Sequence, residues 1–561
     1  MAPAKRPNFL IVVADDLGFS DTGPYGSEIP TPALDRLAKE GITMTGFHTA
    51  SSCSPTRSML LSGTDNHIAG LGQMAEYMRL DPKLFEGRPG YEGYLNDRVA
   101  ALSEILQEAG YLTMMSGKWH LGLTKERAPC SRGFDKNFTF LAGAGNHYNH
   151  EPQLDDTVPK MSAVCGDGLW MEGERFIDRK KEIPENFYST TSFTDKLLDY
   201  LGDRTEEEKE KSFFAYLAYT APHWPLQAPQ ETINKHSGKY DDGPEALRQR
   251  RLQALKDRGL VPSDVKAAPM VGKMHKEWDE MDVAEQKHSA RRMETYAAMV
   301  DLIDQNLQRV INHLEKTEEL DNTFILFMSD NGAEGRLLEA LPIMKNSPFV
   351  VIQKFYNNSI ENIGNHNSFV WYGPRWAAAA TAPSRGFKAW TTEGGIRCPC
   401  IIRYPKLARL SGRVTHEFCT VMDILPTILE LADIKPPGKS FRGREVVLPR
   451  GSSWVPYLKT LDDNKVIHGE GQNIMGWELF GRRAIRRGNW KAIYIPGPLG
   501  SDEWELYDLS SDLGETDDLA LTHPEILKGL LVEYEKYSEE TGLYDPEIMD
   551  DSKLQRWKRG G

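Results

Sequence analysis

Four short, predominantly apolar runs constrain this chain most, because each stops abruptly at polar residues. They are Phe9–Ala14, Tyr111–Met115, Ser212–Tyr219 and Thr323–Met328. Such runs are typical of strands that are buried on both faces, as the strands of parallel sheets are. The chain is therefore expected to build a sheet from strands that lie far apart in the sequence.

Helical patterns separate these runs. Thr31-Pro32 caps a helix that ends at Gly41, and a second helix is expected at Val99–Ala109. The strongest periodicity, with apolar residues three and four apart, covers Met293–Leu314. Strands that alternate with helices predict an α/β fold with a large, mainly parallel sheet flanked by helices.

Polar and charged residues follow each of these strands. Parallel strands end at one edge of their sheet, and ligands bind in the crevice beyond that edge. The residues expected to meet there are Asp15, Asp16, Lys118, His120, His223, Asp330 and Asn331. A single pocket built from separate segments is thus predicted from the residues alone.

Composition narrows the class of protein. The chain has 561 residues and a formal net charge of −14, and no apolar run is long enough to cross a bilayer. Neither nucleic-acid nor membrane binding is expected. No signal-peptide core precedes the first strand, so a cytoplasmic protein is expected, although a chain trimmed at that end would look the same. The cysteines other than Cys53 form no zinc or disulfide pattern and are interpreted as free thiols.

The pattern changes near residue 415. Residues 1–414 are expected to form the catalytic domain and residues 415–561 a smaller C-terminal α+β domain. Segments 134–190, 228–290 and 336–380 are interpreted as insertions that wall the pocket. The smaller domain should contain a helix at His416–Ile434, strands at Trp490–Ile495 and Trp504–Leu509, and a final helix near Pro524–Tyr537.

The segment Cys53-Ser54-Pro55-Thr56-Arg57 contains a candidate nucleophile. Pro55 suits the first turn of a helix, with Ser54 as a candidate N-cap and Gly63 at the other end. A helix N-terminus favours an anion, and Arg57 lies one turn on. The bland alternative is a buried cysteine on an ordinary helix.

Asp15, Asp16, Asp330 and Asn331 offer oxygen ligands. Adjacent carboxylates repel one another unless a cation lies between them, and an all-oxygen site suits Ca²⁺ or Mg²⁺ rather than Zn²⁺. Asp-Asp and Asp-Asn-Gly are also common in turns. Their joint position after two buried strands favours the metal site.

Two segments resemble the signatures of the type I sulfatases. Cys53–Arg57, followed by Leu61-Ser62-Gly63, is similar to the first signature, and Gly110–His120, ending in Gly-Lys-Trp-His, is similar to the second. Glu505–Leu509 resembles the family's C-terminal motif. The resemblance spans the chain, is strongest to bacterial arylsulfatases of the Pseudomonas type, and implies an alkaline-phosphatase-like fold.

The resemblance also implies a mechanism. In that family, a formylglycine-generating enzyme oxidises the cysteine of the nascent chain to formylglycine (3-oxoalanine), whose hydrate is the nucleophile. Cys53 matches this position. Catalytic roles are implied for Cys53, Arg57, Lys118, His120, His223, Lys388 and Asp330. A divalent cation, usually calcium and less often magnesium, would be held by Asp15, Asp16, Cys53, Asp330 and Asn331.

The expected activity is hydrolysis of small sulfate monoesters, with aryl sulfates first and alkyl sulfates next. A phosphonate or phosphate diester hydrolase of the same superfamily is the nearest rival. Known formylglycine members of that group usually carry His after the second metal Asp, where this chain has Asn331. A binding protein with a dead site is the other alternative, but it predicts lost catalytic groups, and none is lost.

Overall fold

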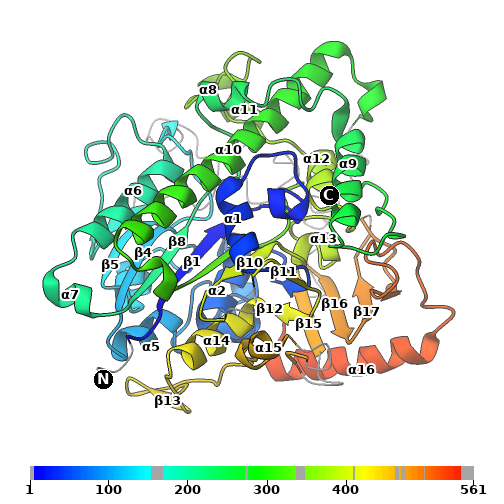
Figure 1. Ribbon diagram of the computed structural model, residues 1–561. Helices are drawn as coiled ribbons and strands as arrows, with labels where there is room; N and C mark the ends of the chain where they lie inside the picture. Colours follow the sequence, from blue (N-terminus) through cyan, green and yellow to red (C-terminus); the bar gives the residue numbers. More distant parts are fainter. Residues whose placement is uncertain are drawn as a thin grey trace.

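The computed structural model describes residues 5–152, 169–271, 276–336, 348–407, 411–461, 466–468, 474–497 and 499–544. Its main sheet confirms the predicted α/β class (Figure 1). The described strands of this sheet are, in spatial order, β11 (Arg413–Thr415), β2 (Ile42–Met44), β10 (Cys400–Arg403), β9 (Thr323–Ser329), β1 (Asn8–Ala14), β8 (Phe213–Ala218), β4 (Leu112–Lys118), β5 (Lys136–Phe140), β6 (Trp170–Glu172) and β7 (Arg175–Phe176).

The centre of the sheet is parallel. Strands β9, β1, β8, β4 and β5 share one direction, so their carboxyl ends lie at one edge. Antiparallel pairing of β10 with β9, and of β6 with β5, begins the flanks. Every residue of β1, β4, β8 and β9 is buried, which explains their apolar sequences.

Two groups of helices cover this sheet (Figure 1). The first contains α1 (Pro32–Glu40), α6 (Ser189–Gly202) and α10 (Val283–Lys316), and the second contains α2 (Cys53–Ser62), α5 (Leu102–Glu108) and α14 (Ile424–Leu431). The other described helices are α3 (Asn66–Ala69), α4 (Ala75–Met78), α7 (Glu206–Glu210), α8 (Gln230–Asn234), α9 (Gly243–Asp257), α11 (Pro348–Phe355), α12 (Pro374–Ala380), α13 (Glu393–Ile396), α15 (Val455–Thr460) and α16 (Pro524–Thr541). None of the described helices is both long and apolar enough to cross a bilayer.

A second, antiparallel sheet of β15 (Ile474–Leu479), β16 (Arg482–Arg487), β17 (Trp490–Tyr494) and β18 (Trp504–Asp508) forms the small C-terminal unit. Helix α16 lies along it (Figure 1). Small two-stranded pairs join β12 (Cys419–Thr420) to β3 (Phe47–His48) and β13 (Ser440–Phe441) to β14 (Arg444–Glu445). The domain boundary at residue 415 stays a prediction.

Three expectations about elements were wrong in part. The helix expected at His416–Ile434 is shorter and corresponds to α14 alone. The residues before it form β12, which pairs with β3, and in the turn between β12 and α14 the Asp423 carboxylate accepts a hydrogen bond from the Thr420 amide (2.7 Å). The segment 134–190 is not purely an insertion, since β5, β6 and β7 extend the main sheet. Helix α10 begins ten residues before the expected start, at an N-cap provided by Asp282. Among the described cysteines none forms a disulfide, as expected; Cys165 lies outside the described residues.

Candidate active site

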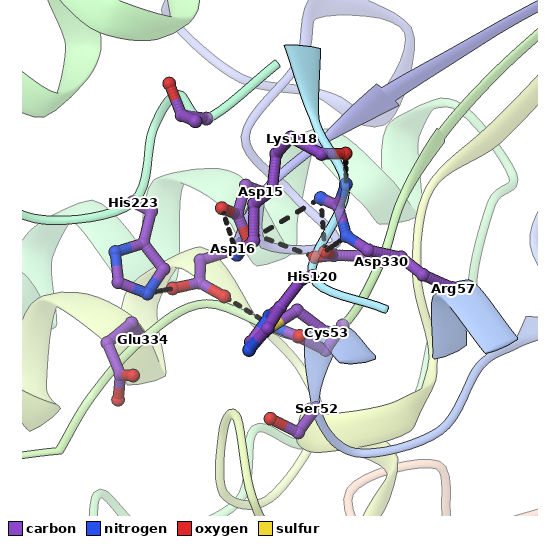
Figure 2. Close-up of polar contacts among 12 residues, drawn as sticks. Asp15, Asp16, Ser52, Cys53, Arg57, Lys118, His120, His223, Asp330 and Glu334 are labelled. Atoms are coloured by element: carbon purple, nitrogen blue, oxygen red, sulfur yellow. Dashed lines mark hydrogen bonds and ion pairs between the residues drawn. The ribbon is translucent and has the colours of Figure 1, made fainter. Parts of the chain in front are cut away.

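The predicted residues meet at the carboxyl edge of the parallel strands (Figure 2). Asp15 and Asp16 follow β1, Asp330 and Asn331 follow β9, and Lys118 is the last residue of β4. Asp16 has a left-handed backbone, with φ of 70°, which a short polar side chain tolerates. This turn follows the buried strand directly and leaves the two adjacent carboxylates with different cationic partners.

Those partners are lysines. Lys118 Nζ donates to Asp15 Oδ2 at 2.6 Å, and Lys388 Nζ lies 2.8 Å from Asp16 Oδ1. Burial raises the pKa of Asp16 to about 7, although Lys388 opposes that shift. Burial likewise raises the pKa of Asp15, against the charge of Lys118. The ionised forms of Asp15 and Asp16 in this pocket therefore depend on nearby cations.

Arg57 is fully buried and holds Asp330. Its Nε and Nη2 donate to Asp330 Oδ2 at 2.9 and 2.7 Å, and its Nη1 donates to the Lys118 carbonyl at 2.9 Å. Burial raises the pKa of Asp330, but Arg57, Lys118 and other cations outweigh it and hold that pKa below its usual value. In this structure Arg57 positions Asp330 and the end of β4; its contact with a bound anion stays a prediction.

Cys53 is the first residue of α2, and its N-cap is Ser52 rather than the expected Ser54. Burial would raise the pKa of the Cys53 thiol, but Lys118, His120 and Lys388 together hold it well below its usual value. Its Sγ lies 3.2 Å from His120 Nδ1. The motif thus places residue 53 in a buried, positively charged corner of the pocket, as the helix N-terminus suggested.

His120 has a partner that sequence reasoning missed. Its Nε2 lies 2.9 Å from Glu76 Oε1, and because a carboxylate only accepts, Nε2 carries the proton. Burial lowers the pKa of His120, but Glu76 and Cys53 raise it to about 9. Glu76 lies on the four-residue helix α4, which has no periodicity to predict it. No sequence signal marked this residue.

A second missed residue, Glu334, adjoins Lys388. Its Oε2 lies 3.3 Å from Lys388 Nζ and 2.8 Å from Arg336 Nη2. Ligand atoms of Asp16, His223 and Glu334 lie within 4.8 Å of one another. The position of Glu334, four residues after Asp330, was the only available hint.

His223 enters the pocket after β8, with Nε2 3.4 Å from Asp16 Oδ2. Its Nδ1 donates to the Trp224 carbonyl at 2.7 Å, and its own carbonyl is 2.9 Å from His147 Nε2. Burial, with Lys388 and Lys118, holds the pKa of His223 well below its usual value. A neutral His223 therefore presents the Nε2 lone pair to the pocket.

The oxygen donors fit a divalent cation. Asp15 Oδ1 and Asn331 Oδ1 are buried and have no hydrogen-bond partner. Ligand atoms of Asp15, Cys53 and Asp330 lie within 4.8 Å of one another, and Asn331 Nδ2 is 2.7 Å from Asp16 Oδ1. Buried polar atoms without partners are costly, and several carboxylates at one point favour a cation. All the residues expected at the site are brought together, and together they can bind a cation and an oxyanion beside residue 53.

Comparison with known proteins agrees with this geometry. The family model described as Sulfatase matches residues 7–434. An uncharacterized sulfatase of Schizosaccharomyces pombe is 57% identical over 97% of this chain and 95% of its own. The arylsulfatase of Klebsiella aerogenes is 35% identical over 80% of this chain and 91% of its own. The solved structure of Ps i-CgsB bound to k-i-k-neocarrahexaose, 22% identical, superposes with a TM-score of 0.65 and covers 99% of this chain and 97% of that one.

Proposed function

Because the chain belongs to the sulfatase family and is a sulfuric ester hydrolase, we propose that it hydrolyses sulfate monoesters, preferably aryl sulfates, by means of a formylglycine made from Cys53. The identity to a named arylsulfatase supports this substrate class. The observation that carries the proposal is the position of Cys53 at the start of α2, with Sγ 3.2 Å from His120 Nδ1 and beside Asp15 and Asp330.

The sulfate group is an anion, so attack by another anion needs positive charge around it. Lys118, Lys388 and the N-terminus of α2 supply that charge in a buried setting, where electrostatic interactions are strong. Arg57 acts through Asp330, which it fixes with two hydrogen bonds. These residues would hold the ester with its sulfur next to residue 53.

In the first step, one hydroxyl of the formylglycine hydrate loses its proton to Asp330 and attacks sulfur. The bond between sulfur and the ester oxygen breaks, and that oxygen takes a proton from Lys388, because the one ring proton of the neutral His223 is on Nδ1. Burial lowers the pKa of Lys388, but the negative charge of Asp16 outweighs burial and raises this pKa above its usual value. Lys388 therefore carries a proton that it can donate. A phenol leaves with a pKa of about 10 and needs less help than an alkanol, so aryl esters should react fastest.

In the second step, His120 removes the proton of the remaining hydroxyl. The aldehyde reforms as the carbon–oxygen bond breaks, and sulfate departs. Glu76 accepts the Nε2 proton of His120, and Nδ1 faces residue 53. Burial lowers the pKa of His120, but Glu76 and the charge of the Cys53 thiolate raise it to about 9. Formylglycine lacks the thiolate charge, so the ring can be neutral there, with its lone pair on Nδ1. An ordinary serine ester lacks the second hydroxyl and would need water to attack sulfur again.

Asp15, Asp16, Asp330 and Asn331, together with residue 53, would hold a divalent cation. Their oxygen donors suit calcium or magnesium, and we propose calcium because the resemblance to the sulfatases implies it. When bound, this ion supplies positive charge to the nucleophile and the sulfate. Formylglycine would be made by a maturation enzyme before folding, because Cys53 is 1% exposed in the folded chain.

Mass spectrometry of the peptide that contains residue 53, together with an aryl sulfate assay of wild type and Cys53→Ala, tests the proposal. An aldehyde at 53 and loss of activity in the variant are expected. A free thiol in fully active protein would refute the formylglycine mechanism. Faster hydrolysis of a matched phosphonate or phosphate diester than of the sulfate would favour the rival activity instead.

A further inference from the structure

A buried cation without a carboxylate partner lies beside Lys388. This residue, Arg482, is at the start of β16 in the C-terminal sheet and is 7% exposed. Its Nη1 donates at 2.7 Å to the carbonyl of Ala389, the residue after Lys388, and its guanidinium carbon lies 5.1 Å from the centre of the Trp390 ring. In the part of the chain that the structure describes, no Asp or Glu forms an ion pair with it.

The charge of Arg482 is not compensated by its surroundings. Arg336, a cation whose charge acts on Arg482, is paired with Glu334 and donates to the Tyr77 hydroxyl at 3.2 Å. Burial first, and then repulsion by Arg336, lowers the pKa of Arg482 to about 10. Buried charges are normally paired because desolvation is costly, and one carbonyl and one aromatic ring offset only part of that cost.

Arg482 contacts the segment that carries Lys388, through the carbonyl of Ala389 and the ring of Trp390. Lys388, the candidate proton donor, contacts Glu334, which also contacts Arg336 and adjoins His223. Packing of Cys53, Tyr77, Ala389 and Phe480 in one small apolar cluster connects residue 53 to the turn before β16. This path runs from the reacting centre to the C-terminal sheet over a few side chains.

The guanidinium also retains donors for a ligand. Among the described residues, neither Nε nor Nη2 of Arg482 has a hydrogen-bond partner, and neither is among the buried polar atoms that are sealed from solvent. A guanidinium in this state suits an anionic oxygen group, because it can donate two parallel hydrogen bonds to it.

We propose that Arg482 binds a second anionic oxygen group, either a carboxylate or a second sulfate, on the alcohol portion of the sulfate ester. The proposal rests on the proposed function and narrows its substrate class to esters that carry two negative charges or more. An aryl sulfate without a second charged group would still react, but without this contact.

Matched aryl sulfates test the idea. Wild type is expected to show kcat/KM about 10-fold higher or more for 3-carboxyphenyl sulfate, resorcinol disulfate or both than for 3-carbamoylphenyl sulfate, which is the uncharged control. A preference for one dianion alone identifies the carboxylate or the sulfate as the ligand. Equal values for all three esters would overturn the proposal. Absence of turnover of every ester by protein with formylglycine at residue 53 would refute the proposed function instead.

Variants assign the preference to the residue. Arg482→Met should remove the preference for the dianionic ester by lowering kcat/KM for that ester more than for the monoanionic control ester, and Arg482→Lys should restore part of the preference. Arg483→Met is the matched control, because Arg483 points to the other face of β16 and lies over the Tyr494 ring. An equal loss for the dianionic and the monoanionic esters in Arg482→Met would indicate a purely structural role and would contradict the proposal.

A measurement on wild type alone covers the case in which Arg482→Met does not fold. The product 3-hydroxybenzoate should inhibit about 10-fold more tightly than 3-hydroxybenzamide. Equal inhibition by the two compounds, in the absence of a dianion preference in turnover, would contradict the proposal.

Discussion

Replacing Glu76 should slow the second half of the proposed reaction more than the first. The carboxylate fixes both the orientation of His120 and the proton on its Nε2, across 2.9 Å. In Glu76→Ala that proton can move to Nδ1, which leaves no lone pair toward residue 53. In Glu76→Gln the hydrogen bond can persist, but its charge is lost.

The expected loss of rate follows from the strength of the hydrogen bond between Glu76 and His120. A hydrogen bond to a charged group contributes about 1.5–3 kcal/mol, which corresponds to a rate loss of about 10- to 150-fold in Glu76→Ala. Glu76→Gln should lose less, since a neutral bond contributes about 0.5–1.5 kcal/mol. Burial opposes the ionised form of Glu76, but His120 outweighs it and lowers the Glu76 pKa to about 2, so the carboxylate is charged throughout the working pH range.

Rapid-mixing kinetics with an aryl sulfate distinguish the two steps. If the sulfated enzyme breaks down slowly, phenol is released in an initial burst equal to the active sites, followed by a slow steady rate. Glu86→Gln is the control, because Glu86 lines the same cavity of about 820 Å³ as Glu76 and His120 without contacting His120. An unchanged kcat in Glu76→Ala would refute this assignment of His120. A lower kcat without a phenol burst and without accumulation of the sulfated enzyme would refute it as well.

Four further outcomes are expected. Chelation with EGTA should abolish turnover and lower the melting temperature, and added calcium should restore both. Arg57→Lys should lower kcat/KM by roughly 10- to 100-fold, since lysine cannot reproduce the fork that holds Asp330; unchanged kinetics would contradict this role. Burial lowers the pKa of His67, but Asp65 raises it to about 9, above the unfolded value of about 6.5. The pair therefore stabilises the fold fully below about pH 6.5, and this stabilisation, at most about 3 kcal/mol, is lost as the pH rises through 9. Urea unfolding of wild type and His67→Gln at pH values below about 6.5 and above about 9 measures the difference. Gly117→Ala should cost about 3 kcal/mol or more by the same assay, because φ is 124° and a Cβ atom would lie 1.9 Å from the Ala218 carbonyl oxygen.

Strand ends were the most predictable part of the site. An apolar run followed by Asp15-Asp16 or Asp330-Asn331 places those side chains at the carboxyl edge of a parallel sheet with no further information. Cys53, Lys118 and His120 followed from motifs whose spacing was already informative. For these residues, local sequence and global topology agree.

Contacts that depend on short elements or on another part of the chain could not be predicted. Glu76 lies on a helix too short to leave a periodic pattern, and Glu334 follows a turn whose direction only the fold defines. Arg482 donates to the carbonyl of Ala389, which lies 93 residues earlier in the chain, from a separate sheet. The contact between Arg57 and Asp330 could not be predicted either, because the two residues are 273 positions apart in the sequence.

The order of strands in the main sheet also determines when, during synthesis of the chain, the fold around Cys53 can form. Strand β2, which precedes Cys53, is flanked by β10 and β11, which come from residues 400–403 and 413–415. About 350 more residues must therefore be made after Cys53 before this side of the sheet can close. At a synthesis rate of about 5–20 residues per second, the cysteine remains outside a finished fold for roughly 20–70 s. The non-local topology that buries residue 53 in the mature protein thus leaves an interval in which a modifying enzyme can reach it.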